Sequence, residues 1–268
     1  MGFYLHEKTA SFGMWGSVNY PNHWGFQASS LLLTFASALL LNAAFNRNEF
    51  MERNSYLTPM LYITLMSFFH SFYYLEGLSL AQIFLVLTVF QLFRLSQNED
   101  GRRTVFNAAF FFGIACTFYP VLFIGLPFLF WMVWVMRPFV LRESALLVMG
   151  FLVPLLYSGT YSFVYKITLD RTEFSSSSSE AHWLNTVVIC LGLILLTLVS
   201  LKGLFAKIAV SSIRMKKIFR LLLLLIFMCL LAILIDFFVF NKVEAGSLII
   251  ICLVFIFLRS DAAHTTVK

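Results

Sequence analysis

The chain has 268 residues, of which 60% are hydrophobic and only 12% are charged, against about 25% charged residues in a typical soluble domain. Nineteen basic and 13 acidic side chains are too few to cover a water-soluble fold of this size. The composition therefore excludes a disordered chain, a collagenous fibre, a disulfide scaffold and a cytosolic enzyme. The long continuous apolar runs also exclude a membrane β-barrel. They predict an all-α, polytopic bundle of transmembrane helices.

Seven apolar runs are long enough to cross a bilayer, which takes roughly 20 residues. They cover residues 26–45, 56–75, 79–95, 144–165, 183–201, 218–240 and 244–258. Only Glu76, Gly77 and Leu78 separate the second run from the third, so we expect an antiparallel hairpin there. These runs define one transmembrane domain over 26–258, with an external tail at 1–25 and a cytoplasmic tail at 259–268.

A further apolar stretch, residues 105–136, contains no charge. As one helix its 32 residues would measure about 48 Å, far more than the hydrocarbon core of roughly 30 Å. Pro120 and Pro127 interrupt the stretch, and proline breaks a helix and biases the preceding residue away from helical geometry. We expect two short helices, 105–118 and 121–136, with a turn at Tyr119-Pro120. One long, kinked and tilted helix is the alternative.

The distribution of Lys and Arg separates these two topologies, because basic residues in short loops favour the cytoplasm. If residues 105–136 turn back, 15 basic residues lie on one side of the membrane and four on the other. If the stretch crosses once, the split is 8 against 11, which is no bias. The charges therefore favour the hairpin, in an inner-membrane protein with its N-terminus outside and its C-terminus in the cytoplasm. A tail outside with no export signal also predicts a further helix upstream of residue 1.

Two places near the external side carry candidate polar chemistry. His70 and Glu76 could together move protons or contact a phosphate or sugar. The alternative is a local pair at the interface. Asp236 is a carboxylate inside a long apolar run, where charge is costly. It should therefore face water, a ligand or a local partner such as Lys242 or Asn241.

The cytoplasmic side carries the other candidate site. Arg137, Arg142 and Glu143 frame a turn at Pro138, and an Arg pair beside helix ends can bind phosphate. The alternative is membrane anchoring, with an Arg–Glu pair capping the next helix. Residues 202–217 are basic on one side and apolar on the other, which predicts an interfacial segment on an anionic leaflet.

The remaining features indicate no cofactor, metal or nucleic-acid partner. The four cysteines all lie in apolar runs without metal-ligand spacing, and of the five histidines only His70 lies in an apolar run. The net charge of +6 is accounted for by the cytoplasmic loops. The serine-rich segment 166–182 predicts a flexible external linker, with a substrate-contacting loop as the alternative.

Three groups of residues carry a family resemblance. They are Asn46-Arg47-Asn48-Glu49-Phe50 with Asn54–Pro59; Phe106-Asn107-Ala108 with Gly113-Ile114-Ala115 and Phe118-Tyr119-Pro120; and Arg137–Glu143 with Gly150-Phe151 and Pro154. Together they resemble a family of multi-pass inner-membrane proteins of the Bacteroidota, a domain of unknown function. The resemblance implies no activity. It also implies one more helix at the start of the chain.

A more distant likeness is to the membrane domains of C-type, polyprenyl-phosphate-dependent glycosyltransferases, whose helix, proline break and short aromatic helix are similar to residues 113–137. Those enzymes carry acidic residues in their first external loop, where this chain has only Glu7. We therefore expect a non-catalytic envelope or lipid-handling protein, with anionic or polyprenyl-phosphate lipids and a membrane protein as its expected partners. A glycosyltransferase-like enzyme and a transporter are the alternatives.

Overall fold

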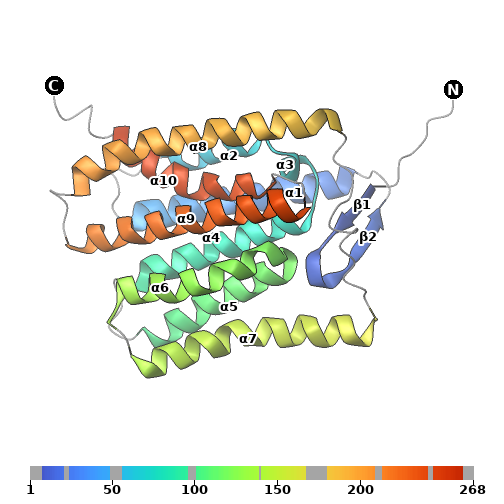
Figure 1. Cartoon of the computed structure of the whole chain (residues 1–268), viewed down its shortest axis with the longest axis horizontal. Helices are drawn as coiled ribbons and strands as arrows, with labels where there is room; N and C mark the ends of the chain where they lie inside the picture. The colour runs from blue at the N-terminus through green and yellow to red at the C-terminus, as the bar shows by residue number, and fades with distance from the viewer. Residues whose placement is uncertain are drawn as a thin grey trace.

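The computed structural model describes residues 8–20, 24–48, 56–95, 101–138, 140–166, 180–208, 213–240 and 244–261. The long helices lie side by side and nearly parallel to the long axis of the molecule (Figure 1). A short antiparallel hairpin, β1 (Lys8–Ser11) and β2 (Ser17–Tyr20), lies across one end of them. The helical bundle confirms the expected fold class, and the hairpin is an addition that the composition did not predict.

Four helices are long and apolar enough to cross a membrane: α1 (Trp24–Arg47), α4 (Gly77–Leu95), α7 (Leu141–Val164) and α9 (Ile213–Phe240). The other expected spans correspond to shorter apolar helices or to helices with shorter apolar parts, so the expected count of seven spans is not established. In α8 (Glu180–Ile208) the apolar part covers Thr186–Lys202. The last expected span consists of a 3₁₀ turn, η4 (Glu244–Leu248), and α10 (Ile249–Asp261).

The second expected span, 56–75, is not one helix. It divides into α2 (Leu57–Met66) and the single turn α3 (His70–Tyr73). Hydroxyl groups bond back to the helix just before the break, where Ser67 Oγ donates to the Thr64 carbonyl at 2.7 Å and Thr64 Oγ1 to the Met60 carbonyl at 2.9 Å. Such bonds compete with the helical ladder. The chain then turns at residues 74–76 into α4, as the short spacing predicted.

The stretch 105–136 does turn back on itself. Helix α5 (Arg102–Phe118) ends at Tyr119, whose backbone is extended, and a 3₁₀ segment, η2 (Pro120–Gly125), leads into α6 (Leu126–Met136). A Cβ placed on Gly101, just before α5, would clash with the Arg137 guanidinium, just after α6. The two ends of this hairpin therefore lie together, and a single long helix is excluded.

Helix α10 occupies the centre of the bundle. Its side chains from Ile249 to Ile256 are at most 1% exposed, and it packs against α2, α8 and α9. On the far side of the molecule α7 packs almost entirely against α5 (Figure 1). The outward faces of α7 and α8 keep large apolar side chains exposed, such as Leu156 and Leu195, which suits contact with lipid tails rather than water.

The N-terminal hairpin is fastened to the bundle by an aromatic anchor. Trp15, in the 3₁₀ turn η1 (Gly13–Trp15) between the strands, donates its indole N–H to Thr117 Oγ1 at 3.2 Å. Its ring also packs against Phe118, Tyr157 and Tyr161. The hairpin thereby covers the junction of α5 and α7 at the end of the bundle.

Candidate functional site

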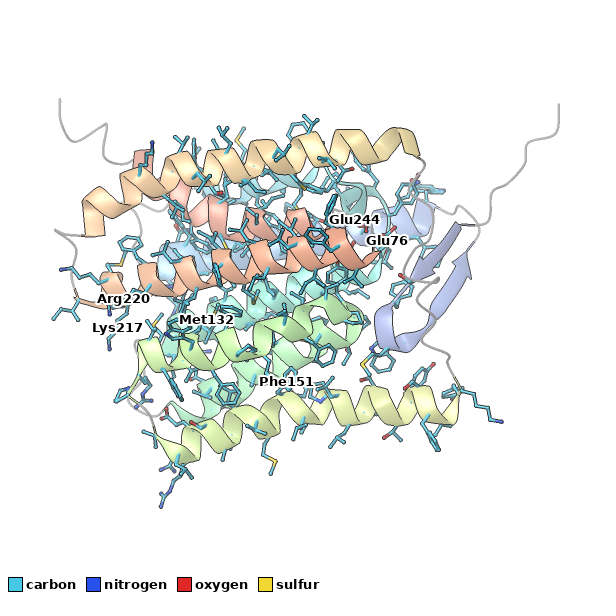
Figure 2. The ribbon with its side chains drawn as sticks, in the orientation of Figure 1. Glu76, Met132, Phe151, Lys217, Arg220 and Glu244 are labelled. Atoms are coloured by element: carbon cyan, nitrogen blue, oxygen red, sulfur yellow. The ribbon has the colours of Figure 1, made fainter. Side chains whose placement is uncertain are left out.

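Charge is separated between the two ends of the bundle. Figure 2 shows Lys217 and Arg220 at one end and Glu76 and Glu244 at the other. Thirteen of the 19 Lys and Arg residues lie near helix termini at the first end, called here the basic end: Arg47, Arg94, Arg102, Arg103, Arg137, Arg142, Lys202, Lys207, Arg214, Lys216, Lys217, Arg220 and Arg259. Among the described residues, the basic residues at the opposite end are only Lys8 and Lys166.

At the basic end, the predicted group of Arg137, Arg142 and Glu143 does not form one site. Arg137 Nη1 lies 3.3 Å from Glu143 Oε1, and the Glu143 side chain is largely buried. Arg142 is exposed, and no ion pair of its side chain is recorded among the described residues. Glu143 belongs to the first turn of α7 and also lies beside Gly101, where α5 begins without a side-chain cap. An internal carboxylate thus takes the place that we expected a phosphate to occupy.

A second group of contacts at the basic end connects three helices. Arg214, in the first turn of α9, donates from Nη2 to Asn48 Oδ1 beyond the end of α1, at 3.1 Å. Three residues later, Lys217 Nζ donates to the carbonyl oxygen of Met136 in the last turn of α6, at 3.0 Å. Because residues three apart share a helix face, Arg214 and Lys217 point from one face of α9 toward the ends of α1 and α6.

The guanidinium groups at this end retain unused donors. The Nε atoms of Arg94 and Arg214 are buried and have no hydrogen-bond partner among the described residues. A buried donor without an acceptor costs about 1–3 kcal/mol, and a guanidinium is suited to bind the oxygens of phosphate. The Arg214 donor at the start of α9 is therefore the candidate anion contact of the basic end.

At the opposite end, Asp236 has a local structural partner. It is 2% exposed, and its Oδ2 accepts the backbone N–H of Ala245 at 3.1 Å. It thus caps the 3₁₀ turn that begins α10. Lys242 and Asn241, which we considered as partners, lie outside the described residues.

Tyr119 lies near Asp236, Glu244 and Glu76. Burial, together with these carboxylates, holds the pKa of Tyr119 well above its ordinary value, so the phenol stays protonated. His70 forms the start of α3, but its side chain is outside what the structure describes. The predicted pair of His70 and Glu76 therefore stays a prediction.

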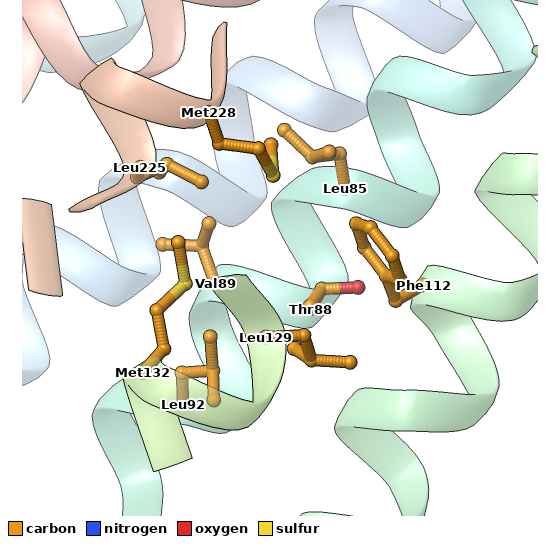
Figure 3. Close-up of a pocket in the computed structure, with 9 residues that line it drawn as sticks. All are labelled: Leu85, Thr88, Val89, Leu92, Phe112, Leu129, Met132, Leu225 and Met228. Atoms are coloured by element: carbon orange, nitrogen blue, oxygen red, sulfur yellow. The ribbon is translucent and has the colours of Figure 1, made fainter. Parts of the chain in front are cut away.

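The bundle contains a small internal cavity of about 10 Å³ between α4, α5, α6 and α9 (Figure 3). This volume holds at most about one water molecule. Of the nine lining side chains only Thr88 is polar, and its hydroxyl donates to the Phe84 carbonyl at 2.9 Å. The cavity is a packing defect rather than a substrate pocket. In the described part of the chain, no three His, Cys, Asp or Glu side chains are grouped for a metal.

The three predicted structural prolines each occupy a break between helices. Pro120 begins η2, Pro127 lies at the start of α6, and Pro138 lies between α6 and α7.

The basic segment 202–217 is not a separate interfacial helix. Its first part completes α8, and its last part begins α9.

A family of unknown function, DUF6427, has a model that matches residues 8–261. The chain belongs to this family. The match begins at the first residue of β1 and ends at the last residue of α10, so the family unit includes both the hairpin and the whole bundle. No curated protein and no solved structure matches the chain.

The α9 contacts of this DUF6427 member were not identified from its sequence. Arg214 and Lys217 were recognised only as part of a basic segment, and Asn48 only as one of the residues that carry the family resemblance. The spacing of three between Arg214 and Lys217 was a usable signal for a shared face. Their partners come from α1 and α6, which are distant in the chain, so no local pattern reveals them.

Proposed function

We propose that this protein is a non-catalytic, multi-pass component of the cell inner membrane, and that its basic end binds anionic lipid at the cytoplasmic leaflet. The observation that carries the proposal is the gathering of 13 basic residues near helix termini at one end of the bundle. Basic residues favour the cytoplasmic side, and each one near the surface of an anionic leaflet attracts it by about 1 kcal/mol.

Contacts within the basic end support binding of lipid headgroups rather than anchoring alone. Arg214 and Lys217 fix the ends of α1 and α6 to α9, and the Arg214 guanidinium keeps a buried Nε donor without an acceptor among the described residues. A lipid phosphate at this face would supply that acceptor. The Arg137–Glu143 pair has its own internal anion, which makes it a structural contact in this proposal.

The test compares the purified protein in nanodiscs of phosphatidylcholine alone and of phosphatidylcholine with phosphatidylglycerol. We expect the anionic lipid to raise Tm, because a ligand that binds only the folded state stabilises it. The variant Arg214→Gln should lose most of this increase. Arg220→Gln is the matched control, because it removes the same charge from an exposed position six residues further along α9 and should keep most of the increase.

Two outcomes would contradict the proposal. An equal Tm in the two kinds of nanodisc would show that the anionic lipid does not bind the folded protein preferentially. An equal loss in Arg214→Gln and Arg220→Gln would mean that general attraction between charges, screened by salt, accounts for the effect without a headgroup site at Arg214.

A further inference from the structure

A second arginine at the basic end, Arg94, has the same unused donor as Arg214. It lies in the last turn of α4, and its Nε is buried without a hydrogen-bond partner among the described residues. Its neighbours Leu92, Phe93 and Leu95 are at most 2% exposed, so the bundle encloses this turn. Arg94 itself stays partly exposed, and an anion can therefore reach its guanidinium from the surface.

The two arginines reach the end of the bundle at a similar level from two different helices. Phe93 of α4 and Phe45 of α1 both pack against Phe255 of α10, with ring centroids 5.3 and 6.0 Å apart. Asn48, which accepts the hydrogen bond of Arg214, lies three residues beyond Phe45 and therefore within about one helical turn of it. The residue that follows Phe93 and the partner of Asn48 thus belong to the same layer of the basic end.

The charge in this layer suits an anion with more than one negative charge. Arg94 and Arg214 each keep a buried Nε donor. Lys217 points from the same face of α9 as Arg214 and gives one of its three N–H donors to the Met136 carbonyl. Three cations from two helices thus keep donors for which the described part of the chain records no acceptor.

We propose that the headgroup site of the basic end binds a phosphate monoester, held between Arg94 of α4 and Arg214 of α9, with Lys217 as the third cation. This inference rests on the proposed function, because it specifies the anionic group that the basic end takes. A phosphate monoester carries about −1.5 to −2 charges at pH 7 and presents three terminal oxygens, whereas a phosphodiester carries a single charge and presents two. Since guanidinium groups bind such oxygens in pairs, two of them on separate helices match the monoester better.

Binding at this place has a structural consequence for the bundle. Leu92 of α4 and Leu225 of α9 both line the small internal cavity (Figure 3), so the packing between these two helices is incomplete beside the site. A phosphate held by Arg94 and Arg214 would connect α4 to α9 at the end of the bundle. The ligand should therefore stabilise the folded state.

Thermal unfolding of the intact chain in nanodiscs tests the proposal. Phosphatidylcholine discs carry either phosphatidic acid, which has a monoester, or phosphatidylglycerol, a phosphodiester, at twice the molar fraction, so that its total lipid charge is at least as large. We expect the higher Tm with phosphatidic acid. Arg94→Gln should lose most of this excess. Arg47→Gln is the matched control, because it removes the same charge from an exposed position in the last turn of α1, and it should keep the excess.

A further arm distinguishes a lipid headgroup from a soluble phosphate ester. Glycerol 3-phosphate, added to the protein in discs of phosphatidylcholine alone, carries the same monoester without acyl chains. An excess with phosphatidic acid and no effect of glycerol 3-phosphate would identify the lipid as the ligand. A higher Tm with glycerol 3-phosphate, and no excess with phosphatidic acid, would identify a soluble phosphate ester at the same site.

Three results would overturn the monoester site. Equal Tm values with the two anionic lipids, together with no effect of glycerol 3-phosphate, would leave the proposed function standing if both lipids raise Tm above that in phosphatidylcholine, and would remove both proposals if neither does. Equal losses of the excess in Arg94→Gln and Arg47→Gln would reduce it to general attraction between charges. If Arg94→Gln does not fold, Arg94→Lys takes its place. It keeps the charge but lacks the planar donor group, so an undiminished excess in Arg94→Lys would exclude Arg94 from the site.

Discussion

Two glycines of α7 differ in what surrounds them. A Cβ on Gly150 would lie 2.6 Å from the Phe106 carbonyl oxygen of α5, whereas a Cβ on Gly159 would meet no atom within 4 Å. Gly150 therefore allows the backbones of α5 and α7 to approach closely, as small residues do between membrane helices. Gly159 has no such role.

This difference makes a prediction for alanine at each position. Gly150→Ala forces α5 and α7 apart and should lower the free energy of unfolding by about 1–3 kcal/mol, the usual cost of overpacking. Gly159→Ala should be neutral or stabilising by up to about 1 kcal/mol, because alanine favours helix. Thermal unfolding in detergent measures both. An equal effect of the two substitutions would contradict the close approach at Gly150.

The charged residues around Pro138 also separate into different roles. Glu143→Ala would leave the partly buried Arg137 guanidinium without the carboxylate of its ion pair. It should lower the free energy of unfolding by about 1–3 kcal/mol, less than the loss of one partner from a fully buried pair. Arg142 is exposed, and Arg142→Ala should change stability by less than about 0.5 kcal/mol. Denaturation of the two variants side by side tests this. If Arg142→Ala proved as destabilising as Glu143→Ala, the two arginines would share one structural role after all.

At the scale of elements, the turn at Tyr119-Pro120 separates α5 from η2 and α6. Pro120→Gly should fold, because glycine also permits a turn. Pro120→Leu should favour continuation of α5, since it removes a barrier of about 3 kcal/mol to helix at this residue, and should therefore lower expression and Tm. Comparison of the two variants in detergent checks this. Equal expression and equal Tm would argue against a required turn.

Elements that are marked by a local signal in the sequence were predictable, and elements that depend on contacts between distant residues were not. Proline and uninterrupted apolar length indicated the α5–α6 hairpin, because both act locally. The break between α2 and α3 has no proline or glycine. Beside it Thr64 and Ser67 bond back to their own helix, and Ser30 of another helix donates to the Ser71 carbonyl. The N-terminal β-hairpin depends on Trp15 and its partners in α5 and α7, so its residues alone did not reveal it.

The same distinction applies to the candidate sites. The basic end was predictable as a region, because the distribution of Lys and Arg among short loops reports on topology. Its individual contacts were not, since Arg214 and Lys217 find their partners on α1 and α6. Arg137 and Glu143 were foreseen as neighbours, but only the fold shows that Glu143 takes the anion position beside α5.

At the scale of the whole molecule, the arrangement of the helices fixes which loops share a side. Arg142 at the start of α7 and Lys217 near the start of α9 both lie at the basic end, and Lys166 follows α7 at the other end. Each of α7, α8 and α9 runs the length of the bundle (Figure 1). If these helices cross the membrane, residues 142 and 217 lie on one side of it and residue 166 lies on the opposite side.

Reporter fusions separate this geometric requirement from the proposed orientation. Fusions after Arg142 and after Lys217 should both report the cytoplasm, and a fusion after Lys166 should report the outside, because basic residues are retained on the cytoplasmic side. If 142 and 217 reported opposite sides, α7 and α8 would not both cross the membrane. If they agreed but both reported the outside, the bundle would stand and the orientation would be reversed. The basic end would then face the outer surface, and lipid binding at the cytoplasmic leaflet would be excluded.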